Sequence, residues 1–142
     1  MKKLLIFVLT LITYSTMTSQ SIADFQWKNR LIVVFTDSIN SQKFQEQLEL
    51  FKNEMDGFND RKLKLIHHLP HKKQIVLPEV SEWQDSSFYK KNKKKKAADF
   101  EVILIGLDGG VKLRQYRLVE TKEIFDLIDS MPMRQSEIRE NN

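Results

Sequence analysis

The chain of 142 residues contains no cysteine. Disulfides are therefore excluded, and so are zinc sites built on thiolates, lipid attachment to cysteine and every reaction with a cysteine nucleophile. No motif for a cofactor stands out among the other residues, and we expect none to be bound.

Long hydrophobic runs are also missing. The first one, Leu4–Ile12, is far shorter than the roughly 20 residues that span a bilayer. Two lysines precede it, and the small residues Ser21 and Ala23 have the spacing that signal peptidases accept. We therefore expect a cleaved export signal over residues 1–23, and an uncleaved membrane anchor is the alternative.

Cleavage after Ala23 leaves 119 of the 142 residues, 24–142, which is the size of one domain with a core of its own. We expect this domain to be soluble in the periplasm or outside the cell. The signal contains two lysines and no acidic residue, so its removal lowers the net charge from +4 to +2. The mature chain is only mildly basic.

The apolar pattern predicts an α/β domain. Leu31–Phe35 is a continuous run typical of a strand buried on both faces. A stripe at helical period then predicts one helix that begins at Ser41 and ends near Gly57. Its members are Phe44, Leu48, Phe51, Met55 and Phe58.

Later elements complete a mixed sheet of about four strands with flanking helices. Strands are expected at 63–66, 100–105 and 111–114, and Thr121 begins a last helix that Pro132 ends. The stretch between the second and third strands reads as irregular, with a lysine-rich insertion near 84–98.

Asp108, Gly109 and Gly110 join two of these strands. A glycine loop that binds phosphate leads from a strand into a helix. Here the next residues alternate between apolar and basic side chains like a strand, and Asp-Gly is typical of a hairpin turn. The three residues therefore predict a turn.

Three stretches carry a resemblance to a known family: FQWKNRLIVVF at 25–35, EVILIGLDGGVKLR at 101–114 and IDSMPMRQSEI at 128–138. Together they resemble a bacterial exported domain of unknown function that is related to the DUDES domains of animal extracellular proteins. The motif residues are Trp27, Arg30, Gly106, Asp108, Gly109, Gly110, Lys112, Met131, Pro132, Met133 and Arg134.

The resemblance implies a thioredoxin-like, peroxiredoxin-related fold. In such enzymes the reactive thiol follows the first strand, where this chain has Thr36–Ser41 without cysteine. The proline that usually precedes the third strand is also replaced, by Ala97–Asp99. Thiol exchange and thiol peroxidase activity are therefore excluded.

His67, His68 and His71 lie within five positions, and imidazole is the commonest metal ligand. Neighbouring strand residues point to opposite faces, however, and Pro70 prevents a helix that would gather the three side chains. We expect a solvated loop and no metal site, with convergence of His68 and His71 as the alternative.

Met131 and Met133 are possible ligands for Cu(I), but methionine more often fills a core. We expect these residues to fix the end of the last helix against the rest of the domain. Pro132 ends the last helix, Met133 packs beneath it, and Arg134 pairs with Glu137 or Asp129.

Six lysines occupy seven positions in Lys90–Lys96, which we call the lysine segment. It is either a solvated insertion or a site that attracts anionic lipid or polysaccharide. The candidate binding residues are Lys90, Lys91, Lys93, Lys94, Lys95, Lys96, Trp27 and Arg134. For Trp27, a lid over the end of the sheet is the preferred interpretation.

Asp37 lies where open sheets of this kind carry sites, beside Ser38 and Ser41, but no histidine is expected near them. Helix capping is the preferred role of Asp37 and Ser41.

The leading hypothesis is an exported binding module without redox activity, whose partner is an envelope or extracellular protein and not a nucleic acid. A surface adaptor and a small enzyme of another chemistry are the alternatives, and the oligomeric state stays open.

Overall fold

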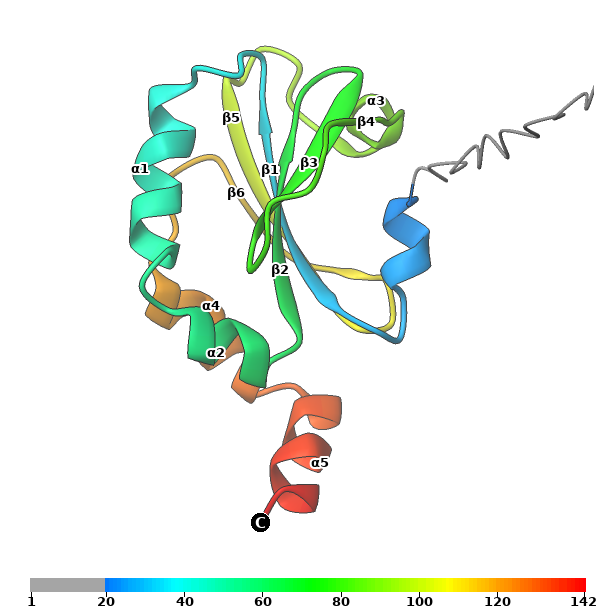
Figure 1. Cartoon of the computed structure of the whole chain (residues 1–142), viewed down its shortest axis with the longest axis vertical. Helices are drawn as coiled ribbons and strands as arrows, with labels where there is room; N and C mark the ends of the chain where they lie inside the picture. Colours follow the sequence, from blue (N-terminus) through cyan, green and yellow to red (C-terminus); the bar gives the residue numbers. More distant parts are fainter. Residues whose placement is uncertain (1–19) are drawn as a thin grey trace, which may run out of the picture.

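The computed structural model describes residues 20–142, so the charged head and apolar run of the expected export signal lie outside the described residues. A six-stranded mixed sheet with flanking helices forms its centre, in the order β4-β3-β2-β1-β5-β6 (Figure 1). The α/β prediction is confirmed, with two strands more than expected. The strands are β1 (Arg30–Thr36), β2 (Leu63–His68), β3 (Lys72–Leu77), β4 (Gln84–Asp85), β5 (Phe100–Ile105) and β6 (Val111–Gln115).

The central strand β1 pairs in parallel with β2 and antiparallel with β5. All seven of its residues are buried, as the continuous apolar run predicts. β5 and β6 form the expected antiparallel hairpin around the Asp108 turn. The sheet thus has one end near Thr36, where β1 stops, and an opposite end near Arg30, where β1 starts.

Helices cover the two faces of the sheet unequally. On one face α1 (Gln42–Phe51), α2 (Met55–Asp60) and α4 (Thr121–Asp129) enclose a core that includes Ile32 and Val34. On the other face a 3-10 helix, η1 (Ile22–Phe25), and the short α3 (Phe88–Asn92) pack against the alternate residues of β1. α5 (Pro132–Glu140) lies at the lower end of the view, below α2 and α4 (Figure 1).

The single helix predicted between Ser41 and Gly57 is wrong in its length. α1 ends at Phe51 and α2 begins at Met55, although the apolar stripe continues through both helices into the core. Gly57 lies inside α2 rather than at a helix end. A Cβ at this position would overlap the ring of Phe125 from α4, so glycine permits the close approach of the two helices.

Three further expectations need correction. The stretch after β2 is not irregular, because it forms β3, β4 and α3. Pro132 does not only end α4: it occupies the first turn of α5, where its missing N–H has no consequence. Thr121 is not the cap of α4, since Glu120 holds that position and the Thr121 hydroxyl donates to the Leu50 carbonyl at 2.7 Å.

Among residues 20–142, no helix combines the length and apolar character needed to cross a membrane.

Candidate ligand-binding site

The end of β1 is the place where thioredoxin-like enzymes carry their thiol, and here it holds a buried threonine. The hydroxyl of Thr36 donates to the Ser38 carbonyl at 2.9 Å, so the His67 Nε2–H must be the donor in their 2.7 Å contact. Ser41 caps α1 by accepting from the Phe44 N–H, as predicted. His67 therefore binds Thr36 and neither serine, which leaves no serine activated by a base.

Asp37, the acidic residue beside these serines, is held by Tyr89 of α3. The Tyr89 hydroxyl donates to its carboxylate, and Lys93 Nζ lies 3.8 Å from the same oxygen. Burial is the first cause that raises the pKa of Tyr89, and the hydrogen bond with Asp37 adds to it. Asp37 thus anchors α3 and Lys93 to the end of β1, and it does not cap α1.

The prediction of a solvated loop for His67 and His68 is wrong, because both are buried residues of β2. The His67 ring stacks on Phe44 with centroids 3.6 Å apart, on the face covered by α1. His68 lies on the opposite face, with Nδ1 at 2.6 Å from the Leu69 carbonyl and Nε2 at 2.8 Å from the Ser86 hydroxyl.

Burial is the main reason why the pKa of both rings falls to about 4. A neighbouring positive charge lowers each pKa further: that of His68, when it is protonated, for His67, and that of Lys73 for His68. The two imidazoles are therefore neutral at pH 7. His71 is exposed, and within residues 20–142 no three His, Asp or Glu side chains gather in a way that could hold a metal ion.

The lysine segment is folded onto the protein rather than extended from it. Its first part belongs to α3, and the backbone N–H groups of Lys94 and Lys95 donate to the buried carboxylate of Glu101. The side chain of Lys93 is only 3% exposed, and Lys95 Nζ lies 4.1 Å from the centre of the Tyr116 ring. Lys95 is nevertheless exposed, and so are Lys90, Lys91, Lys94 and Lys96.

The motif residues gather at the opposite end of the sheet, where β1 starts. Gly109 has a φ of 81°, and the Gly110 N–H donates to the Asp108 side chain at 2.9 Å, while Lys112 Nζ binds the same carboxylate at 2.8 Å. The turn therefore uses its own polar groups internally and is not a phosphate loop, as predicted. Trp27 is tied to this end by its backbone N–H, which donates to the Leu107 carbonyl at 2.7 Å.

Two predictions about side chains in this region are wrong. Trp27 is 62% exposed, so its side chain does not form a lid over the sheet. Met133 is 42% exposed and does not pack beneath α4, because the chain continues into α5 and turns this side chain outward. Met131 is half-buried against the core, as expected.

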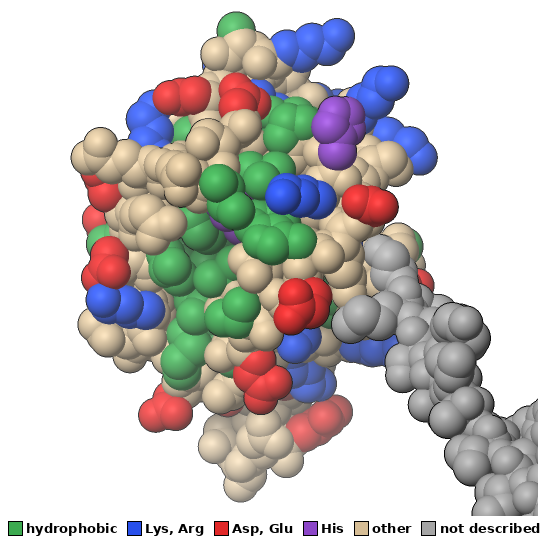
Figure 2. Space-filling view, turned by 45° about the horizontal axis from the view of Figure 1, so that its top comes forward, with side chains coloured by type: hydrophobic (Ala, Val, Ile, Leu, Met, Phe, Trp, Pro, Cys, Tyr) green, Lys and Arg blue, Asp and Glu red, His purple; other side chains and the backbone are tan. Residues whose placement is uncertain are grey.

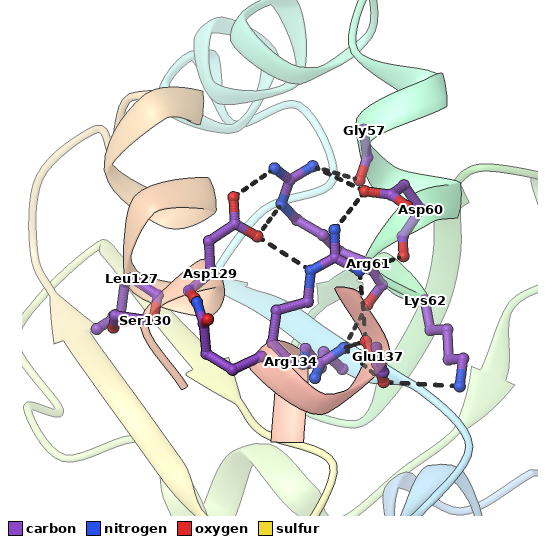
Figure 3. A network of polar contacts seen from close by, with 11 residues as sticks. Gly57, Asp60, Arg61, Lys62, Leu127, Asp129, Ser130, Arg134 and Glu137 are labelled. Atoms are coloured by element: carbon purple, nitrogen blue, oxygen red, sulfur yellow. Dashed lines mark hydrogen bonds and ion pairs between the residues drawn. The ribbon is translucent and has the colours of Figure 1, made fainter. Parts of the chain in front are cut away.

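Arg134 lies at the centre of a set of ion pairs that we call the arginine network (Figure 3). Its Nε binds Asp129 at 3.1 Å, its Nη1 lies 3.4 Å from Glu137, and its Nη2 pairs with Asp60. Arg61 also binds Asp129, at 2.7 and 3.0 Å. Both predicted partners of Arg134 are confirmed, while its 4% exposure leaves little of it for an outside ligand.

Charge within the arginine network shifts the pKa of its members. Burial alone would raise the pKa of Asp129, but hydrogen bonds from Arg61 and Arg134 outweigh it and lower the value. Burial likewise opposes the charge of Arg134, and Asp129 and Asp60 together raise its pKa instead. The network is thus held in its ionised form.

Arg30, the first residue of β1, connects the arginine network to the motif residues. It is 1% exposed, and its Nη1 donates to the Arg61 carbonyl at 2.9 Å and to Glu137 at 3.1 Å. Its Nε and Nη2 atoms are buried and have no hydrogen-bond partner. No other buried side-chain nitrogen or oxygen within residues 20–142 lacks a partner.

Beside Arg30 lies a pocket of about 560 Å³, which we call the motif pocket. Seven of the eleven motif residues line it: Arg30, Gly106, Asp108, Lys112, Met131, Pro132 and Met133. Leu107, Leu127 and Ser130 complete the wall. The three stretches that carry the family resemblance, far apart in the sequence, therefore meet at one cavity.

Sequence reasoning missed part of this site. Asp60 and Arg61 follow α2 in a stretch without a motif, and only their contacts with α4 and α5 give them a role. Arg30 was noticed as a motif residue, but its burial was not, since a charged residue before an apolar run usually marks the exposed start of a strand.

Comparison with known proteins places this chain in a family. Residues 21–137 match the family model described as Domain of unknown function (DUF4174). The reduced 2-Cys peroxiredoxin of Plasmodium vivax has a similar crystal structure, with a TM-score of 0.56 and 12% sequence identity over 80% of this chain and 83% of that one. A search of curated proteins finds no match. The peroxiredoxin likeness supports the thioredoxin-like fold alone, and the chain belongs to the family Domain of unknown function (DUF4174).

Proposed function

We propose that this protein is an exported binding module without redox activity, and that the motif pocket is where it engages its partner. The observation that carries the proposal is the convergence of three separate motif stretches on this pocket. A thioredoxin-like scaffold without cysteine has no thiol chemistry to perform, so a cavity surrounded by the family motifs is the best remaining feature.

The partner class we propose is an envelope or extracellular protein. Export is supported by the basic and apolar start of the chain, and the extracellular setting by the resemblance to DUDES domains. Hydrophobic side chains also gather on one face of the molecule, with lysine and arginine side chains around its upper edge (Figure 2). Exposed hydrophobic areas with a polar rim are typical of protein contacts.

A second candidate function is adhesion to anionic lipid or polysaccharide. It is favoured by Lys90, Lys91, Lys94 and Lys96, which are exposed on a segment that Glu101 and Asp37 anchor to the fold. Ordered lysines of this kind attract a charged surface, and the attraction weakens as salt screens it.

Crosslinking in cells separates the two candidates. A photo-crosslinking amino acid is placed at Met133, on the rim of the motif pocket, and in a control chain at Gln45, an exposed position of α1. A discrete protein partner captured from Met133 but not from Gln45 supports the binding module, above all if it persists when Lys90, Lys91, Lys94 and Lys96 are changed to glutamine.

Capture that disappears with the four lysines, or that yields lipid and glycan alone, contradicts the binding module and supports the surface adaptor. The chain with these four lysines and the chain with four glutamines, each mixed with vesicles of anionic lipid, give the complementary result. The surface adaptor predicts binding that weakens steeply between low and moderate salt, and the module predicts little binding at any salt concentration.

A further inference from the structure

The unpaired edge of Arg30 is the feature of the motif pocket that points to a ligand. Nε and Nη2 lie on the same side of a guanidinium group, and together they match the two oxygens of a carboxylate. Buried donors in folded proteins are almost always paired, because an unpaired one loses its hydration without compensation. Arg30 has two such donors side by side, while its Nη1 is fully used by Arg61 and Glu137.

The charges around Arg30 favour an occupant with a single negative charge. The arginine network contains four cationic side chains and three carboxylates, so one positive charge lacks a counterpart. A monoanion beside Arg30 would balance the network, whereas a phosphate dianion would exceed it. The cations are Arg30, Arg61, Lys62 and Arg134, and the carboxylates are Asp60, Asp129 and Glu137.

The rest of the pocket wall fits the remainder of such a ligand. Leu107, Leu127 and Met131 line it with apolar side chains. The first turn of α5 also faces it, through Pro132 and Met133, and no side chain caps that helix. Helix N-termini attract negative charge, which reinforces the preference set by Arg30.

We propose that the motif pocket binds a carboxylate with an apolar substituent, whose two oxygens accept from Nε and Nη2 of Arg30. This inference rests on the proposed function, since it names the chemistry recognised at the same pocket. Both nitrogens are buried, so the ligand must displace a side chain that covers them. A free small acid and the C-terminus of a polypeptide share this chemistry.

The test follows the side-chain Nε–H resonance of Arg30 by NMR in the folded chain. The probes are N-acetyl-leucine, its neutral amide, inorganic phosphate and a hexapeptide that ends in a free leucine carboxylate. We expect the carboxylate probes to shift the resonance saturably and the neutral amide to leave it unchanged. Tighter binding of the hexapeptide than of N-acetyl-leucine, by tenfold or more, would identify a polypeptide C-terminus as the source, and similar affinities would identify a small acid.

Two variants keep the test independent of folding. Arg30→Lys retains the charge but loses the two-donor edge, and we expect at least a tenfold loss of affinity, read from the amide resonances of the pocket wall. Ser130→Phe places a ring at an exposed position of the wall and should block binding while the chain stays folded. A matched change outside the pocket, Ser136→Phe in α5, should leave binding intact.

Several results would overturn the carboxylate proposal. They are an equal response to the acid and its amide, a response to inorganic phosphate alone, unchanged binding in Ser130→Phe, or a bound water that stays in contact with the Arg30 Nε–H at saturating probe. Failure here is distinct from failure of the binding module. If a protein partner is captured from Met133 while no carboxylate probe binds, the carboxylate proposal fails and the proposed binding module stands.

Discussion

Arg134 and Arg30 show how differently two buried arginines in one network are satisfied. Arg134 pairs with three carboxylates, one each from α2, α4 and α5, and its role is to hold these helices together. Arg30 shares only Glu137 and keeps one edge unpaired. Removing a partner from a structural arginine of the first kind destabilises the fold, because an ion left unpaired away from water is unfavourable.

Asp129→Asn tests the structural role of the arginine network. The change removes the charge that binds Arg61 and Arg134, and we expect unfolding free energy to fall by about 1–2 kcal/mol, less than for a fully buried pair because Asp129 is one-third exposed. Urea denaturation measures the loss. Asp126→Asn, in the exposed pair with Lys122 on the same helix, is the control and should stay within about 0.5 kcal/mol. Equal effects of the two changes would contradict the role given to Asp129.

The buried histidines make stability depend on pH in a defined window. Their pKa is lowered to about 4 in the folded chain, against 6.5 for an ordinary imidazole. Between these values the unfolded chain binds protons that the folded chain does not, so stability falls as the pH decreases from about 6.5 to about 4. Each ring contributes a slope of up to about 1.4 kcal/mol per pH unit.

Denaturation midpoints measured from pH 7.5 to 4.5 test this slope. His68→Gln, which keeps polar atoms for Leu69 and Ser86, should remove about half of the slope, whereas His71→Gln at an exposed position should leave it unchanged. Stability that is flat down to pH 4.5 in the natural chain would show that the rings are protonated in place. Asp129 does not interfere, because its lowered pKa makes its stabilisation disappear only at still lower pH.

Only part of this residue-scale picture was predictable from the sequence. Two of the three acidic partners of Arg134 were, because Asp129 and Glu137 are close to it in the chain, whereas Asp60 is not. The burial of His67 was not, since it depends on Phe44 from α1 and Trp83 from beyond β3. Contacts of that range leave no periodic trace in a local stretch.

At the scale of elements, the junction between α2 and α4 explains why a correct apolar stripe led to a wrong helix length. Phe58 and Phe125 pack edge to face, with centroids 6.1 Å apart, and Arg61 lies 4.0 Å above the Phe125 ring. The break at 52–54 lets α2 lie against α4 at this point. Periodicity marks which residues are buried, whereas the break depends on a helix that follows about sixty residues later.

Gly57→Ala tests this junction. Alanine normally stabilises a helix interior by about 1 kcal/mol relative to glycine. Here its Cβ would overlap the Phe125 ring, and we expect a net loss of about 1–3 kcal/mol, typical of overpacking. Thermal and urea unfolding measure the change, and Asn59→Ala at an exposed position of the same helix is the control. The double variant with Phe125→Leu should recover part of the loss, and a stabilising Gly57→Ala would disprove the steric account.

For the whole molecule, the sequence predicted the centre of the sheet and missed its edge. β1, β2, β5 and β6 are apolar or alternating runs and were recognised, together with the hairpin turn. β3 begins with Lys72 and Lys73 and is only partly buried, so it lacks the pattern of a strand. Its place follows from pairing with β2, which was not visible locally. The motif pocket could not be predicted from a local stretch either, because it forms only when three distant stretches of the chain come together.

The first residues of the domain connect its fold to its proposed export. Ile22 is 8% exposed and packs in the core beneath η1, and Ser21 and Asp24 form a capping box at the start of that helix. Cleavage after Ala23 would remove both the side chain and the cap. We therefore expect a chain that begins at Asp24 to be less stable than one that begins at Gln20, by about 2–4 kcal/mol.

Urea denaturation of these two chains measures the difference, and Ile22→Ala in the longer chain isolates the contribution of packing. The N-terminus of the protein recovered from outside the cytoplasm, read by mass spectrometry, then shows which chain the cell produces. A processed chain that still contains Ile22 would place the cleavage site upstream of Ile22 and keep this side chain in the core. A chain that begins at Asp24 with undiminished stability would instead show that η1 is dispensable, and the domain would start where the signal pattern predicts.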